Sequence, residues 1–90
     1  MRKLIIASIS ILIGTATFAA SSAQAANPAF CNLYAQNAVW QEGQNLAHGC
    51  GLFGPRWSFD FAGHYAWCLS VSKAQANAER NARKWSLITC

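Results

Sequence analysis

Four cysteines constrain the fold of this chain more than any other feature of its sequence. They are Cys31, Cys50, Cys68 and Cys90, and the last of them is the final residue. An even number of cysteines in a short chain from an oxidising compartment is typical of a disulfide framework. Each disulfide stabilises a small domain by about 2–4 kcal/mol, which matters where the hydrophobic core is small. The sequence therefore predicts a small domain held by two disulfides.

Residues 1–25 have the form of a cleaved export signal. A cationic start precedes an apolar run from Leu4 to Ile13, and Ala23-Gln24-Ala25 has the small-x-small form of a peptidase site. The apolar run is shorter than the roughly 20 residues that a membrane span needs. We therefore expect a signal peptide at 1–25, export to the bacterial periplasm or exterior, and a mature domain at 26–90 without a stable transmembrane span.

Three segments of the mature domain have helical patterns. Asn27-Pro28 suits the cap and first position of a helix that extends to Ala47, and Gly49 can end it in a left-handed conformation. A second helix begins near Ser58 or Asp60, both of which can accept from first-turn N–H groups. Ser72-Lys73-Ala74-Gln75 has the form of a capping box and starts a third helix. The predicted fold class is all-α: a small three-helix, disulfide-stabilised domain.

Helical spacing also predicts which side chains are buried. The inner face of the first helix consists of Cys31, Ala35, Ala38, Val39, Glu42 and Leu46. The second helix carries Phe61, Tyr65, Cys68 and Leu69 on one side. The third helix has a stripe of Val71, Ala74, Ala78, Ala82, Trp85 and Ile88.

Helix geometry removes one of the three possible disulfide pairings. Cys31 and Cys50 lie about 28 Å apart along one helix, whereas a disulfide needs Cα atoms within about 7 Å. An up-down-up bundle favours Cys31–Cys68 together with Cys50–Cys90. A short second helix that turns aside allows Cys31–Cys90 together with Cys50–Cys68, and this alternative stays open.

The charge of the mature domain is modest, with five basic side chains against three acidic ones. This balance lacks the dense stripe of Lys and Arg that nucleic-acid binding needs, so we expect no nucleic-acid partner. Glu79 and Arg83 form a favourable i,i+4 pair on the third helix. A weak attraction to anionic envelope polymers or lipids is compatible with the charge.

Two histidines lie close to cysteines. His64 and Cys68 are one helical turn apart, a spacing that can chelate zinc, and His48 lies two residues before Cys50. Export favours oxidation of the thiols instead, and the spacing matches no standard zinc finger. We therefore predict disulfides, no metal site and no cofactor.

Ser58, Asp60 and His64 are residue types that occur in nucleophilic catalysis. A catalytic site also needs a positioned nucleophile, an oxyanion hole and a pocket that excludes water. A mature domain of 65 residues with few charged side chains offers little material for these. We predict that the protein is not an enzyme.

Residues 54–68 carry the densest set of functional side chains. A helix buries only a stripe, so some of these aromatic rings should be exposed or line a groove. The alternative is that the small core needs these large side chains for burial. Trp and Tyr combine apolar area with a polar group and are enriched at binding surfaces. The candidate binding residues are Arg56, Trp57, Asp60, His64, Tyr65 and Trp67.

These features favour a non-catalytic binding module that recognises a cell-envelope glycan, or a secreted or periplasmic protein, through residues 54–68. A cationic membrane-active or toxin-like peptide is the second hypothesis, because the third helix is amphipathic and the domain is positively charged. An inhibitor of a secreted enzyme is the third, with loop 49–57 inserted into a cleft. No sequence feature separates the first hypothesis from the third.

Overall fold

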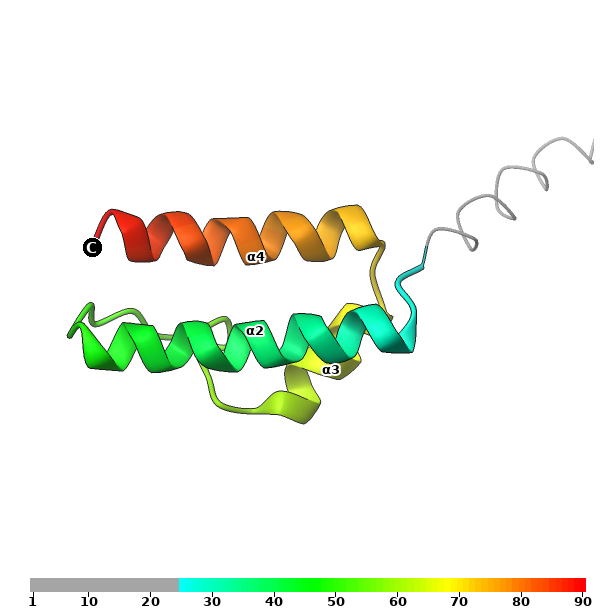
Figure 1. Ribbon diagram of the computed structural model, residues 1–90, viewed down its shortest axis with the longest axis horizontal. Coiled ribbons are helices and arrows are strands. Elements are labelled where there is room, and N and C mark those ends of the chain that lie inside the picture. Colours follow the sequence, from blue (N-terminus) through cyan, green and yellow to red (C-terminus); the bar gives the residue numbers. More distant parts are fainter. Residues whose placement is uncertain (1–24) are drawn as a thin grey trace, which may run out of the picture.

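The computed structural model describes residues 25–90, which form three α-helices and no β-sheet. The helices are α2 (Pro28–Ala47), α3 (Phe61–Leu69) and α4 (Lys73–Ile88). Helices α2 and α4 run in the same direction, and the shorter α3 runs against them (Figure 1). The predicted all-α class is confirmed. The predicted signal peptide lies outside the described residues, except for Ala25.

Side-chain caps begin each helix at the predicted places. The side chain of Asn27 accepts a hydrogen bond from a first-turn N–H of α2 at 2.8 Å. Of the two predicted caps of α3, Asp60 rather than Ser58 accepts from the first turn. Ser72 and Gln75 form both hydrogen bonds of the capping box that begins α4. These bonds satisfy donors that a helix N-terminus otherwise leaves free.

The two disulfides join opposite ends of the bundle. Cys31–Cys68 links the first turn of α2 to the last turn of α3, and Cys50–Cys90 links the residues that follow α2 and α4. Their Cα atoms are 5.5 Å and 5.6 Å apart, respectively. The pairing expected for an up-down-up bundle is confirmed and the alternative is wrong. No thiolate is left to bind zinc.

The hydrophobic core is small and surrounds the Cys31–Cys68 disulfide, whose sulfur-bearing residues are both 0% exposed. On α2 the predicted inner face is right for its first members, but Leu46 lies at the surface. On α3, Cys68 is buried, whereas Phe61 and Leu69 are partly exposed. The other side chains of the core cluster are Ala26, Tyr34 and Ala76, with Phe30, Tyr65 and Val71 packed against it.

Helix α4 turns a different face inward from the one predicted. Trp85 and Ile88 are 63% and 60% exposed, whereas Arg83 is buried. The reason is that α2 offers hydrogen-bonding groups to α4. The side chain of Gln41 accepts from Arg83 Nε at 2.6 Å and donates to the Arg80 carbonyl at 3.2 Å. Polar side chains of α4 therefore pack on α2 together with the buried Ala76. Of the predicted stripe, Val71 packs against the core as expected, whereas Trp85 and Ile88 lie at the surface.

One buried amide holds the connection between α2 and α3. Asn45 is 1% exposed; its Nδ2 donates to the Leu52 carbonyl at 2.7 Å, and its Oδ1 accepts from the Leu52 N–H at 3.0 Å. Gly49 and Gly51 have φ of 61° and 70°, left-handed values that allow the chain to reverse after α2. The predicted left-handed Gly49 is confirmed.

We expect Asn45→Ala to destabilise the domain by about 2–3 kcal/mol, because it leaves both backbone groups of Leu52 without partners in a partly buried place. Urea unfolding followed by circular dichroism measures this loss. Asn32→Ala is the matched control, since Asn32 is an exposed residue on the same helix. Equal stability of the two variants would contradict the role given to Asn45.

Candidate functional site

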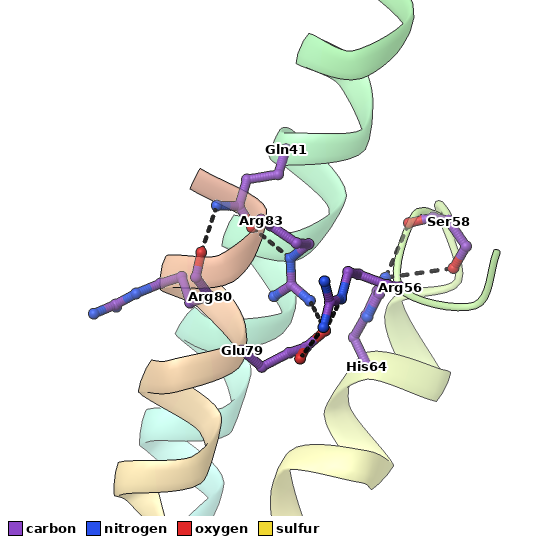
Figure 2. Close-up of polar contacts among 7 residues, drawn as sticks. All are labelled: Gln41, Arg56, Ser58, His64, Glu79, Arg80 and Arg83. Carbon is purple, nitrogen blue, oxygen red and sulfur yellow. Dashed lines mark hydrogen bonds and ion pairs between the residues drawn. The ribbon is translucent and has the colours of Figure 1, made fainter. Parts of the chain in front are cut away.

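A cavity of about 400 Å³ lies between α3 and α4, with residues of the 55–60 connection along its edge. Helix α2 contributes Tyr34, which is 3% exposed. Helix α3 contributes His64 and Trp67, and α4 contributes Glu79 and Arg83. Figure 2 shows how the polar members of this set approach one another from α4 and from the connection. The fold thus brings four segments of the sequence to one concave site.

The cavity gathers four of the six predicted binding residues: Arg56, Asp60, His64 and Trp67. Trp57 does not line it, and with 8% exposure it is a buried structural side chain. Tyr65 is half-buried against the core and stacks on Phe61. The reason is helical spacing: positions 64 and 67 share one face of α3, whereas position 65 points about 100° away from position 64.

The Glu79 carboxylate links the segment 55–60 to α4. Arg56 Nε and one of its terminal nitrogens donate to the two oxygens of Glu79 at 2.6 Å and 3.0 Å (Figure 2). Arg83 approaches the same carboxylate at 3.4 Å from one turn further along α4. A bidentate, charge-assisted pair of this kind fixes the orientation of both groups. The cavity wall therefore presents two guanidinium groups around one carboxylate.

Tyr34 and Trp67 form the aromatic part of the cavity. Their ring centroids are 5.6 Å apart, and the guanidinium carbon of Arg83 lies 5.1 Å from the centre of the Tyr34 ring. Burial raises the pKa of Tyr34 above its ordinary value, against the opposite influence of Arg83, so its hydroxyl keeps its proton at neutral pH. Trp67 is 40% exposed and leaves much of its ring open to a ligand.

Ser58 and His64 contact each other where the connection meets α3. His64 Nε2 lies 3.0 Å from the Ser58 carbonyl and 3.4 Å from its hydroxyl (Figure 2). A carbonyl oxygen only accepts, so Nε2 is the donor in its contact with the carbonyl. Asp60 accepts from the Gly63 N–H at 3.0 Å as the cap of α3. These contacts hold the connection against α3.

Sequence reasoning missed Tyr34, Glu79 and Arg83 as members of the site. The i,i+4 spacing of Glu79 and Arg83 was visible as a local pair, but nothing in the sequence placed Arg56 on the same carboxylate, 23 residues away. Tyr34 lies three residues after Cys31 and four before Ala38, a spacing that indicates burial on the inner face of α2 but gives no sign of a place in a binding site. The site depends on tertiary packing.

No protein-family model, curated protein or solved structure matches this chain. Within residues 25–90, no helix is both long enough and apolar enough to cross a membrane. The same part of the chain contains no group of three or more His, Cys, Asp or Glu side chains that could hold a metal ion. A proposal about function therefore has to be argued from the geometry of the cavity.

Proposed function

We propose that this protein is a small, exported, non-catalytic binding module whose cavity holds a sugar unit of a cell-envelope glycan. The observation that carries the proposal is the position of the exposed Trp67 ring in the same cavity as the Arg56–Glu79 pair. A sugar ring has apolar C–H faces and a rim of hydroxyl groups. An aromatic ring packs against the apolar faces, and planar charged side chains form hydrogen bonds with the hydroxyl groups.

The size of the cavity favours a glycan over a protein ligand. Its volume of about 400 Å³ falls within the range of roughly 300–1,000 Å³ that small-molecule sites occupy. A protein partner would instead bury about 800 Å² on each side, over a much flatter surface. The two disulfides indicate an oxidising environment, which agrees with a ligand outside the cytoplasm.

Trp67→Ala is expected to weaken glycan binding about tenfold or more, because the variant loses the aromatic surface of the cavity. A glycan array first identifies the saccharide, and titration calorimetry then compares wild type and variants. Trp85→Ala is the matched control, since Trp85 is 63% exposed on α4 and does not line the cavity. Before each titration, the intact mass of the exported protein determines where its N-terminus lies and shows that both disulfides have formed.

Two results would overturn the proposal: full saccharide binding by Trp67→Ala, or an equal loss in Trp67→Ala and Trp85→Ala. Near-ultraviolet circular dichroism keeps a loss of binding separate from a loss of folding. Both tryptophans are partly exposed, so neither substitution removes a core side chain.

A further inference from the structure

Helices α2 and α4 form a second groove, of about 520 Å³, whose lining includes no residue of α3. Trp40 of α2 and Lys84 and Ile88 of α4 line it. Trp85 lies three residues before Ile88, and Leu33 lies four before Asn37, which also lines the groove, so helical spacing places each beside a groove residue. The four apolar side chains are each 57–65% exposed. We refer to Leu33, Trp40, Lys84, Trp85 and Ile88 as the α2–α4 face.

The charges of the molecule are segregated with respect to this face. The chain has three acidic residues, and none of them lines the groove. Glu42 is buried and accepts from Asn45, Asp60 caps α3, and Glu79 is held by two arginines on the other side of α4.

The cations of the groove are left without acidic partners. Arg80 and Lys84 both line it, and neither takes part in an ion pair within residues 25–90. Figure 2 shows the Arg80 side chain extending away from the Glu79 carboxylate. Of the Asp, Glu, Lys and Arg side chains within residues 25–90, only the basic Arg80 and Lys84 line the groove, beside the neutral amides Asn37, Gln41, Gln44 and Asn81, so the α2–α4 face complements an anionic surface.

We propose that the α2–α4 face binds peripherally to the surface of an anionic lipid bilayer. Exposed indole rings lie favourably at the level of lipid headgroups, where apolar and polar surroundings meet. Lys and Arg side chains add attraction to anionic headgroups while their alkyl stems lie along apolar surface. Several large exposed apolar side chains around one groove are typical of an interaction surface.

The distribution of the apolar side chains favours a lipid surface over an acidic peptide. A peptide in the groove would contact Trp40 and Ile88, but Leu33 and Trp85 lie outside the groove lining and would stay in water. A bilayer interface accommodates the outer surfaces of both helices at once. The sugar-binding cavity contains none of these residues, so this proposal stands independently of the proposed function.

Sedimentation with vesicles tests the proposal, using the exported protein and vesicles of phosphatidylcholine with or without phosphatidylglycerol. Binding is expected only to the anionic vesicles, with a blue shift of tryptophan emission, and it should fall as salt is added. Lys84→Gln should weaken binding about fivefold, and Trp85→Ala by a similar factor. Trp67→Ala is the matched control and should bind as wild type does. Because all variants have the same N-terminus, a difference in vesicle binding between them comes from the substituted side chain.

Equal binding to both kinds of vesicle, binding to neither, or an unchanged Lys84→Gln variant would overturn the proposal. A protein that ignores vesicles but binds polyglutamate would show that the α2–α4 face recognises an acidic protein segment instead. Loss of vesicle binding in Trp67→Ala would place the lipid contact at the cavity. Circular dichroism of each variant verifies its fold.

Discussion

Removal of the Cys31–Cys68 disulfide is expected to unfold the domain, whereas removal of Cys50–Cys90 leaves it folded but less stable. The two pairs enclose similar stretches of chain, with sequence separations of 37 and 40 residues. Their effects on the entropy of the unfolded chain are therefore nearly equal. What differs is burial: Cys31 and Cys68 are fully buried in the core, and Cys90 is exposed.

The core has too few side chains to compensate for the loss of its central disulfide. The core of a domain this small supplies at most about 3–5 kcal/mol, so the domain depends on its disulfides, each of which costs about 2–5 kcal/mol to lose. Replacing Cys31 and Cys68 by alanine also leaves a cavity in that core. Loss of Cys31–Cys68 thus removes a crosslink together with part of the core, whereas loss of Cys50–Cys90 removes a crosslink alone.

Two double variants measure the difference by urea unfolding and near-ultraviolet circular dichroism. Cys31→Ala with Cys68→Ala should lose the near-ultraviolet signal, and Cys50→Ala with Cys90→Ala should keep it with a lower unfolding midpoint. A mild reductant should likewise open Cys50–Cys90 first, as read by alkylation and peptide mapping. Equal stability of the two double variants would contradict the central role of the buried pair.

The sequence allowed accurate prediction of features that depend on residues a few positions apart. The caps of α2 and α4 and the end of α2 at Gly49 are of this kind, because each is set within one helical turn. Helix length also excluded one of the three disulfide pairings, but the choice between the other two depended on the up-down-up arrangement, which the structure confirms. The caps and the helix end needed no knowledge of how the helices pack.

Packing explains what the sequence did not predict. A pattern of apolar residues predicts a buried stripe, but on α4 the hydrogen bonds that Gln41 offers to Arg83 and Arg80 favour the polar side. Likewise, Trp57 and Trp67 lie in one aromatic segment, yet the first is buried and the second opens onto the cavity. Local sequence could not distinguish them, because Trp57 belongs to the connection before α3 and its burial depends on how that connection packs on the helices.

The same inversion of α4 links the two proposed surfaces. Since the polar side of α4 packs on α2, Glu79 and Arg83 reach the cavity at one edge of that contact, and Arg80 and Lys84 line the groove at the other. Trp85 and Ile88 are then directed outward. A single choice of packing face thus produces both a polar cavity that suits a sugar and a cationic apolar face that suits a membrane surface.

Arg83→Ala is expected to destabilise the domain by about 3 kcal/mol or more, the largest effect of any single charged residue. The guanidinium is 1% exposed; it donates to Gln41 at 2.6 Å, contacts Glu79 at 3.4 Å and packs on the Tyr34 ring. Its removal leaves a buried amide without its partner and a void between α2 and α4. Lysine should not restore stability, because it lacks the planar group that serves all three contacts.

Lys84→Ala provides the matched control for this prediction. Lys84 is adjacent in the sequence and exposed, so its loss should change stability by no more than about 0.5 kcal/mol. Urea unfolding of both variants measures the free energies, and calorimetry with the saccharide measures the effect on the cavity. Because Arg83 positions Glu79 and Tyr34, a folded Arg83→Ala protein should also bind the saccharide more weakly than wild type does. An Arg83→Ala variant as stable as Lys84→Ala would mean that apolar contacts alone hold α4 on α2.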